Sequence, residues 1–414
     1  MSSNESTTSA VPTGADAVKR PAWRPLFLVS IFLSAIAASL LILKFNKFAP
    51  TPFFWLWLTW TAALWSAVSG VSRSWVRATL FNLGFVPSVL AGAEAYFVTH
   101  EGQSEQLPRG FLVADEALGW APAKGVQARA YESGYAGLFH GPAGLVYDVK
   151  YTIDSNGLRK APPWRADDSA GTVLFFGCSF TFGTGLEDNE TLPYQLGALS
   201  GGRYRTFNFG FGGYCPAQML AAIESGMVQR VVTTAPQYAF YVAIPHHVWR
   251  VAGRAFLGES TPRYVLEADE TLHRAGKFAD PKHRVGLPGR VEGQFNKSAL
   301  WRRISRSAAR ITDDDLRLYF AVVRRAQQLI AAQYPKIQFR VILWPGLDYT
   351  QASSTYDKLR EGFRRMGIPV DLVEDILPGI IADRSPFALS PIDPHPNALA
   401  DRLIAQYVLN KISQ

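Results

Sequence analysis

The stretch that most constrains the fold is Gly171–Leu196, which reads GTVLFFGCSFTFGTGLEDNETLPYQL. A buried strand at Thr172–Phe176 runs into a small-residue turn that holds Ser179, and a helix is expected to open near Thr191. A serine on such a turn lies at the carboxyl edge of a parallel sheet, where open α/β folds bind their ligands. The first turn of a helix also offers backbone N–H groups to a developing oxyanion. Ser179 is therefore a candidate nucleophile, although the same pattern occurs in many α/β proteins without catalysis.

From Gly171 onward, strands and helices alternate along the chain. Further strands are expected at Tyr204–Phe209, Tyr238–Ile244, Ile337–Trp344 and Pro369–Val373, and helices at Pro216–Arg230, Asp313–Gln333, Tyr356–Met366 and Pro396–Leu409. This alternation predicts an α/β fold with a doubly wound, flavodoxin-like parallel sheet spanning residues 169–414. An insertion at about 250–310 lacks periodicity and is rich in Gly, Pro and Arg. It could be a lid, a substrate-side loop or a membrane-facing flap.

Three apolar runs precede this domain. Residues 1–24 are rich in Ser, Thr, Ala and Gly and are expected to form a disordered tail. Residues 25–98 form a membrane region with runs at Leu26–Leu43, Phe53–Val71 and Ala78–Val98, the last weakened by Asn82, Pro87 and Glu94. The first run lacks a clear cleavage site and others follow it, so we expect transmembrane anchors and no cleaved leader.

The number of spans decides on which side of the membrane the domain lies. With the N-terminus inside, three spans place five Lys and Arg residues in the cytoplasm and three outside. This bias favours a multi-pass protein of the cell inner membrane with a periplasmic catalytic domain. Two spans from the same N-terminus would leave the domain in the cytoplasm. Between membrane and domain, residues 99–168 are turn-rich, with a strand at Val146–Ile153, and predict a small β-rich connecting segment.

Composition excludes several classes of function. The formal charge is +8, but the Lys and Arg residues are dispersed, which argues against nucleic-acid binding. The chain has two cysteines, Cys178 and Cys215, so no zinc-type spacing exists. GTGL at Gly183–Leu186 lacks the Lys and Ser/Thr of a phosphate loop. We therefore expect no metal and no cofactor. The cysteines follow neighbouring strands and could be two buried thiols or, in an oxidising compartment, a disulfide.

A base for Ser179 is found near the C-terminus, in SPIDPHPNALADRLIAQYVL. His395 follows Asp393 by two residues, just before the final helix, on the sheet edge where Ser179 is expected. A carboxylate that binds one ring nitrogen fixes the tautomer and leaves the other nitrogen facing the hydroxyl. The alternative is that both residues cap the helix. The glycine-rich turn Asn208–Cys215, NFGFGGYC, allows a backbone N–H such as that of Gly213 to approach a substrate oxygen.

In this order, the three pieces resemble the SGNH, or GDSL-like, hydrolase superfamily, in a membrane-anchored bacterial form. The resemblance covers about residues 171–414 and implies catalytic Ser179, Asp393 and His395, with the N–H groups of Ser179 and Gly213 in the oxyanion hole. Cys178 stands where the family most often has Asp, and the Asp-to-His spacing is one residue shorter than the common form. The alternative that Cys178 is the nucleophile departs from the family pattern.

The third family block departs further, because AIPHHVWR lacks the usual Asn after the third strand. His246 occupies about that place and is a candidate for the oxyanion hole. Asn208 and His247 are candidates for supporting roles, although His247 could equally be a polar loop residue.

The resemblance implies a membrane-anchored serine esterase that cleaves an acyl ester of a glycan, a sugar or a lipid through an acyl-serine intermediate. One alternative is an O-acyltransferase that uses the same triad to acylate an exported polysaccharide, with polysaccharide-modification partners that the sequence does not identify. A second is a catalytically inactive scaffold of a membrane assembly.

Overall fold

The structure is a computed structural model that describes residues 23–45, 51–100, 105–133, 144–165, 171–254, 260–280, 295, 297–301, 304, 311–346, 352–391 and 393–414. The predicted N-terminal tail therefore lies almost wholly outside the described residues. The chain divides into two compact units. One comprises Met1–Val98 with Asn296–Leu300, and the other comprises Thr99–Phe295 with Trp301–Gln414.

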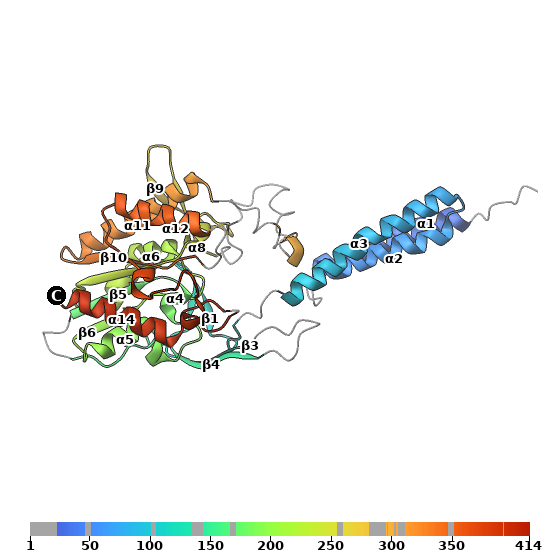
Figure 1. Cartoon of the computed structure of the whole chain (residues 1–414). Coiled ribbons are helices and arrows are strands. Elements are labelled where there is room, and N and C mark those ends of the chain that lie inside the picture. Colours follow the sequence, from blue (N-terminus) through green and yellow to red (C-terminus); the bar gives the residue numbers. More distant parts are fainter. Residues whose placement is uncertain are drawn as a thin grey trace, which may run out of the picture. The chain divides into compact units, whose positions relative to one another are not determined.

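The second unit contains a five-stranded parallel sheet in the order β11-β10-β7-β5-β6 (Figure 1). Its strands are β5 (Gly171–Phe176), β6 (Tyr204–Asn208), β7 (Tyr238–Ala243), β10 (Gln338–Leu343) and β11 (Val370–Leu372). Numbered along the chain within the sheet, this order is 2-1-3-4-5, the flavodoxin-like arrangement. The predicted fold class is confirmed. The strand order reverses between β5 and β7, and the carboxyl ends of these strands flank the crevice where such folds bind ligands.

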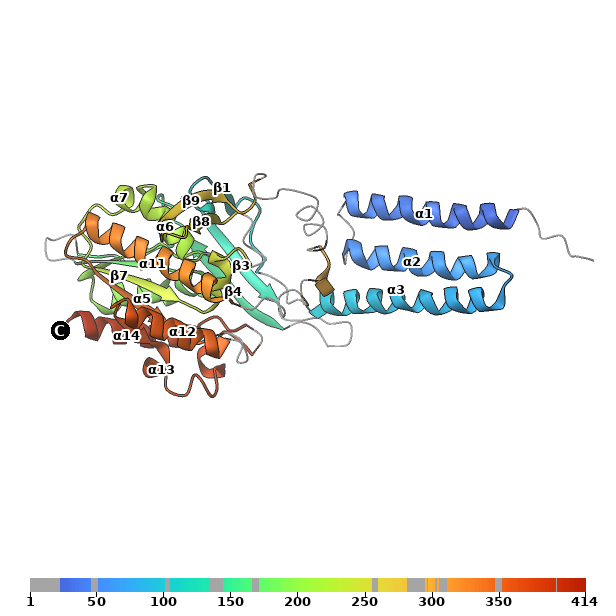
Figure 2. The same ribbon diagram turned by 90° about the horizontal axis from the view of Figure 1, so that it is seen from above.

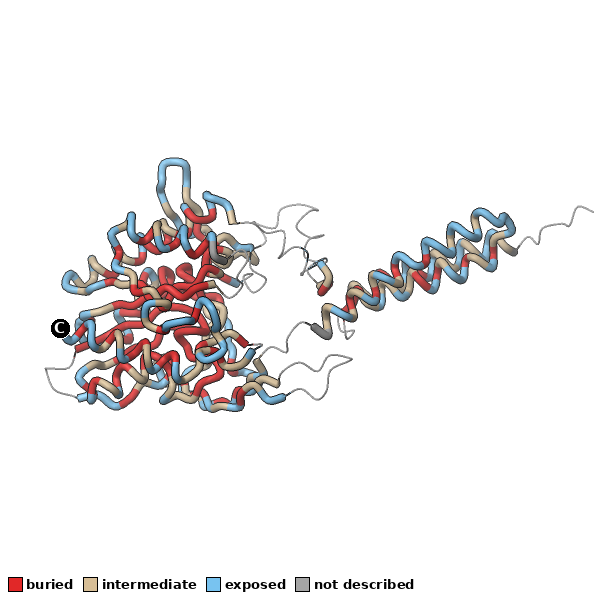
Figure 3. Tube along the Cα trace, in the orientation of Figure 1, coloured by how far each residue is buried: buried red, intermediate tan, exposed pale blue. Residues whose placement is uncertain are grey.

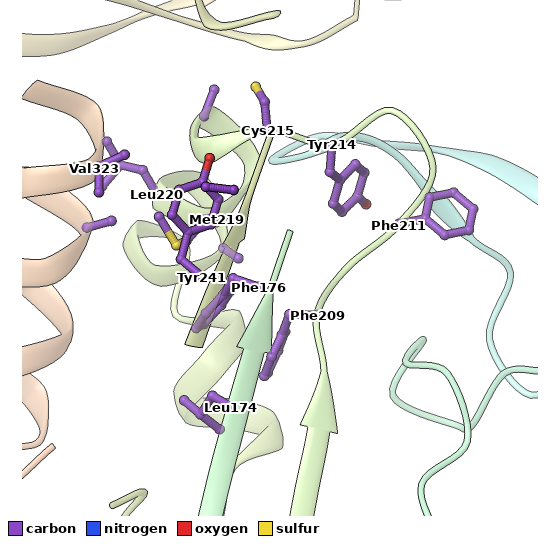
Figure 4. Packing of buried hydrophobic residues seen from close by; sticks show 14 of the residues in the cluster. Leu174, Phe176, Phe209, Phe211, Tyr214, Cys215, Met219, Leu220, Tyr241 and Val323 are labelled. Carbon is purple, nitrogen blue, oxygen red and sulfur yellow. The ribbon is translucent and has the colours of Figure 1, made fainter. Parts of the chain in front are cut away.

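The buried sheet divides the core into two layers, because side chains of each strand alternate between its two faces. Leu174 and Phe176 of β5 pack on one face, whereas Val173 and Phe175 pack on the other. The first face is covered by α6 (Pro216–Glu224) and α11 (Asp313–Gln333), and Figure 4 shows side chains from both helices meeting the strands. Helices α5 (Leu192–Leu199) and α14 (Ala398–Ile412) cover the second face. Buried residues accordingly concentrate around the sheet in Figure 3.

The remaining elements of this unit connect or border the layers. They are β1 (Leu112–Asp115), β2 (Gly119–Pro122), β3 (Gln127–Ser133), β4 (Leu145–Thr152), α4 (Ser179–Phe182), η1 (Asp188–Glu190), α7 (Met227–Val231), α8 (His246–Val251), β8 (Pro262–Leu266), β9 (Leu272–Lys277), α12 (Ala352–Arg365), α13 (Val373–Ile376) and η3 (Ser385–Phe387). In the connecting segment, β1 pairs with β2 and β3 pairs with β4, each antiparallel.

Two local predictions are corrected. The single helix expected at Pro216–Arg230 is two helices, α6 and α7, because Gly226 between them has a left-handed φ of 73°. The insertion at about 250–310 is not without regular structure, because β8 and β9 form an antiparallel hairpin. Glu270 in its turn has a φ of 65°, which an L side chain rarely adopts.

The first unit holds three helices that lie side by side in Figure 2: α1 (Trp23–Phe45), α2 (Pro52–Gly70) and α3 (Ser74–His100). Two of them are long and apolar enough to cross a membrane, over Arg24–Leu43 and Ser74–Val98. α2 packs closely on α3 at Gly84, where an added Cβ would lie 2.1 Å from Nε1 of Trp65. The glycine therefore allows the two helices to approach.

Glu94 in α3 is fully buried, although the sequence pattern marks it only as a charge that weakens an apolar run. Its carboxylate accepts hydrogen bonds from Thr51 Oγ1 at 3.2 Å, Ser298 Oγ at 3.1 Å and the backbone N–H groups of Ala299 and Leu300 at 3.0 and 2.7 Å. Thus Ser298–Leu300, a piece of the insertion, belongs to the helical unit. The Glu94 carboxylate binds this piece by accepting hydrogen bonds from its backbone N–H groups.

We expect Glu94→Ala in the full chain to expose this piece of the insertion. Loss of a buried hydrogen-bonded carboxylate leaves its donors unpaired, which corresponds to about a tenfold or greater rise in local opening. The measurement is the rate of trypsin cleavage after Lys297, whose ammonium donates to the Leu43 carbonyl at 3.3 Å. The exposed Glu116→Ala variant is the control, and equal cleavage rates in the two variants would contradict the role of Glu94.

Candidate active site

Ser179 is placed by a sharp turn at the carboxyl end of β5. Gly177 has a φ of 155°, and a Cβ there would lie 2.1 Å from Thr181 Oγ1, so only glycine fits. Ser179 is the first residue of the short helix α4, which ends at Gly183 with a φ of 81°. The sequence signal missed α4 because four residues are too few to show periodicity. The turn leaves Ser179 at the sheet edge, 9% exposed.

The loop before α14 brings a histidine and a carboxylate to this serine. Nε2 of His395 lies 2.8 Å from Oγ of Ser179, and Nδ1 lies 2.6 Å from Oδ1 of Asp393. The same carboxylate oxygen accepts the backbone N–H of His395 at 3.0 Å. Burial opposes ionisation of Asp393, but the hydrogen bonds and charge of His395 outweigh it, so the pKa of this carboxyl is lowered. The three residues singled out from the sequence are therefore in mutual contact.

Asp393 and His395 do not cap helix α14, contrary to the alternative raised from the sequence. The side chain of Asn397 caps α14 by accepting the N–H of Ala400 at 3.0 Å. The N–H of Leu389 donates to the His395 carbonyl at 2.9 Å, which fixes the loop from its other side. The histidine is therefore free of any capping role and its ring is held toward Ser179.

The glycine-rich turn after β6 packs directly on the serine turn. The Asn208 side chain donates to the Thr181 carbonyl at 2.8 Å and accepts the Gly210 N–H at 3.0 Å, so it joins the two turns. Gly213 has a φ of 79°, and a Cβ there would lie 3.1 Å from the Trp120 ring. Among the described residues, nothing accepts a hydrogen bond from its N–H. Its place in an oxyanion hole stays a prediction.

The two histidines after β7 have different environments. His246 is the first residue of α8, and its ring lies 5.4 Å from that of Trp249. A contribution from His246 to the oxyanion hole stays a prediction. His247 is buried, and its Nδ1 lies 2.6 Å from the hydroxyl of Tyr241, which in turn lies 3.1 Å from that of Tyr319. Burial lowers the pKa of His247, so this histidine is a neutral core residue and not a polar loop residue.

Both cysteines are free and buried thiols, so the structure contains no disulfide between Cys178 and Cys215. Sγ of Cys215 lies 3.2 Å from Oε1 of Gln218, and burial raises the pKa of this thiol to about 12. The Cys215 thiol is therefore a poor nucleophile at neutral pH.

Arg159 is the residue at this site that the sequence analysis missed. Its side chain is fully buried, and its guanidinium donates to the carbonyls of Phe182, Gly183 and Leu186 at 3.1, 3.0 and 2.6 Å. Nε pairs with Asp188 at 2.9 Å. The lone Arg in a turn-rich stretch gave no signal of this role. It holds the end of α4 and the loop that follows, and thereby positions Ser179 without touching it.

The solved structures similar to this chain are described as lipolytic proteins and acetylesterases. A member of the lipolytic G-D-S-L family from Veillonella parvula is 13% identical, with 59% of this chain and 100% of that chain covered and a TM-score of 0.35. An acetylxylan esterase from Geobacillus stearothermophilus, solved as a catalytic mutant, is 14% identical, with coverage of 60% and 97% and a TM-score of 0.33. A carbohydrate acetylesterase family member from Sinorhizobium meliloti is 10% identical, with coverage of 58% and 97% and the same TM-score of 0.33.

No family model matches the sequence, and a search of curated proteins finds no match.

We expect Arg159→Met to destabilise the second unit. Removing the buried guanidinium takes the ion-pair partner from Asp188 and leaves the carbonyls of Phe182 and Leu186 without their donor, at a cost of about 3–5 kcal/mol. Arg205→Met is the matched control, because Arg205 also stacks on two aromatic rings, Trp164 and Phe207, but is only half-buried. The midpoint of thermal unfolding, followed by near-ultraviolet circular dichroism, should fall far more for Arg159→Met. Equal falls would show that the carbonyl contacts contribute little.

The lowered pKa of Asp393 gives a pH signature. A carboxyl with a depressed folded pKa contributes stability that is fully present above its unfolded pKa of about 3.9 and is lost as pH falls through the folded pKa. Asp393→Asn lacks this contribution. The difference in thermal midpoint between wild type and variant should thus shrink as the pH falls below about 4. A difference that shrinks well above pH 4 would contradict the assignment.

Proposed function

We propose that this protein is a serine esterase in which Ser179 is the nucleophile, His395 the general base and then acid, and Asp393 the group that orients the histidine. The observation that carries the proposal is the 2.8 Å contact between His395 Nε2 and Ser179 Oγ, continued by the 2.6 Å contact to Asp393. Such a chain of contacts activates a serine hydroxyl, because the histidine can take its proton as the oxygen attacks a carbonyl carbon.

The reaction proceeds in two steps. Oγ of Ser179 attacks the ester carbonyl while its proton passes to His395, and the imidazolium then protonates the departing alcohol. A water molecule, deprotonated by the same histidine, attacks the acyl-serine, which releases the carboxylic acid and restores the hydroxyl. The His395 side chain is 25% exposed, so water can reach the base. This supports hydrolysis as the second step, and transfer to a sugar hydroxyl would need water to be excluded.

The backbone supplies candidate donors for the tetrahedral oxyanion. The N–H of Ser179 lies in the first turn of α4, where no intrahelical acceptor exists for it. The N–H of Gly213 has no acceptor among the described residues. Two such donors directed at one oxygen stabilise the negative charge that develops there, typically by about 3–4 kcal/mol per donor.

We further propose that the helical unit anchors the enzyme in the cell inner membrane with the catalytic unit on the periplasmic side. The two helices with spanning length support the membrane anchor. The excess of Lys and Arg in the loops assigned to the cytoplasm supports the periplasmic side, provided that the chain crosses the membrane three times. α2 would form a third span. The substrate class, an acyl ester of a glycan, a sugar or a lipid, is the one that the family resemblance implies.

The test is labelling of the full-length membrane protein with a fluorophosphonate probe, which reacts only with activated serines. Ser179→Ala should abolish labelling, and His395→Ala should slow it about 100-fold or more. Ser225→Ala, at the half-buried serine that caps the C-terminus of α6, is the control and should label normally. A well-folded wild type that does not label would instead favour the inactive scaffold. A topology reporter at the C-terminus, run beside these variants, decides between periplasm and cytoplasm.

A further inference from the structure

A short piece of the insertion is docked at one end of the three-helix unit. Ala299 is fully buried there, and the N–H groups of Ala299 and Leu300 donate to the Glu94 carboxylate at 3.0 and 2.7 Å. The ammonium of Lys297 donates to the carbonyl of Leu43 at 3.3 Å. Glu94 stands near the last residue of α3 and Leu43 near the last residue of α1. The docked piece therefore lies where these two helices end.

The depth of this piece follows from the helix that holds it. Glu94 stands four positions before Val98, the last residue of the candidate span Ser74–Val98. With a rise of about 1.5 Å per residue, Glu94 lies about 6 Å inside the end of that span. In a membrane that α3 crosses, this is the boundary between the lipid headgroups and the acyl chains, where amphipathic segments lie.

A chain segment at that depth needs partners for its backbone, because an unpaired N–H group is costly in an apolar medium. Residues 299–301 are helical, and the first N–H groups of a helix have no acceptor within it. The Glu94 carboxylate accepts two of these N–H groups and also the hydroxyl of Ser298 at 3.1 Å. Glu94 thereby makes this backbone compatible with an apolar surrounding, which gives an ionisable residue a function inside a span.

Exposed apolar side chains flank the docked piece on both sides. Phe295 is 40% exposed, Trp301 39% and Ile304 53%. The ring centroids of Phe295 and Trp301 lie 5.2 Å apart, so the two rings form one aromatic surface. Trp301 directly follows Leu300 in the sequence, and Ile304 can lie at most about 14 Å from Leu300. The connectivity of the chain therefore keeps these side chains close to the end of the helical unit.

The chemistry of these side chains fits a lipid surface. Aromatic residues gather at membrane–water interfaces, and a Lys there keeps its alkyl stem in the apolar layer while its charge reaches the headgroups. Lys297 stands between Phe295 and Trp301 in the sequence. On α3, Tyr96 is 54% exposed only two positions after Glu94, which is about 3 Å along the helix axis. Aromatic side chains from two separate parts of the chain are thus found at one level, as in an interfacial belt.

We propose that Phe295, Trp301 and Ile304 form an interfacial anchor that enters the boundary between lipid headgroups and acyl chains, and that Glu94 holds this anchor in place. The inference goes beyond the esterase activity, and it rests on the proposal that the helical unit crosses a membrane. It gives the insertion a partner, the lipid surface, and gives the second unit an attachment to the membrane besides the covalent link after α3.

The test places an NBD fluorophore on one added cysteine in the full-length protein, which is reconstituted in nanodiscs of equal parts phosphatidylcholine and phosphatidylglycerol. Cys178 and Cys215 are buried, so the folded protein takes the label at the added thiol. Ile304→Cys carries the probe at the proposed anchor. Its emission should be lost to lipids that carry a nitroxide near the headgroup, and less so to lipids that carry the nitroxide near the end of the acyl chain.

Matched positions are labelled in parallel. Val89→Cys, well inside the span Ser74–Val98 and 68% exposed, should be quenched most by the nitroxide near the chain end. Ile381→Cys, at an isoleucine of the second unit that is 48% exposed, should keep its emission with both lipids. When Glu94→Ala is added to Ile304→Cys, quenching should fall to the level of the Ile381 probe, because the docked piece has lost its acceptor.

The inference is overturned by an Ile304 probe that keeps its emission while the Val89 probe is quenched. It is also overturned if the Ile304 probe is shielded from aqueous iodide but not quenched by either lipid, since a protein would then cover this surface. Equal quenching at Ile381 would show contact that is not specific to the anchor, and quenching that survives Glu94→Ala would refute the role of Glu94. An unquenched Val89 probe would instead overturn the proposed membrane anchoring, and this inference with it. Fluorophosphonate labelling of the same samples reports on the esterase proposal separately.

Discussion

The buried guanidinium of Arg159 is the interaction on which the catalytic unit depends. It lies between the rings of Tyr151 and Phe182, 4.1 and 4.7 Å from their centroids, and pairs with Asp188. A buried charge is tolerated only where hydrogen bonds replace its hydration, and here the carbonyls after α4 supply them. The loop that follows Ser179 is therefore held in place from the connecting segment.

The contacts of Arg159 show that the connecting segment has a structural role in the second unit. Its composition suggests a small spacer between apolar helices and an α/β domain. In the structure, Tyr151 is fully buried and bonds to Gly185, and Trp120 donates to the Gly212 carbonyl at 3.0 Å. The segment thus supports both the serine turn and the glycine-rich turn. It behaves as part of the catalytic unit, and the division of the chain into compact units groups it there as well.

The sequence predicted what depends on local pattern. Buried strands such as Gly171–Phe176 and the helix Asp313–Gln333 were recognisable because apolar runs and periodicity are local signals. Ser179, Asp393 and His395 were found because each stands in a short motif. Arg159 could not be found, since its partners are carbonyl groups that any residue could provide. Glu94 was misjudged for a similar reason: its partners lie about two hundred positions away along the chain.

The separation of the catalytic pair along the chain has a consequence for biosynthesis. Ser179 and His395 are 216 residues apart, and the histidine lies at the start of the last helix. During synthesis the sheet can begin to form while the base is still missing, because the ribosome delivers the chain from its N-terminus. The hydroxyl of Ser179 is then an ordinary alcohol. In the proposed mechanism, Ser179 becomes reactive only when the final segment docks, so its activation would depend on completion of the chain.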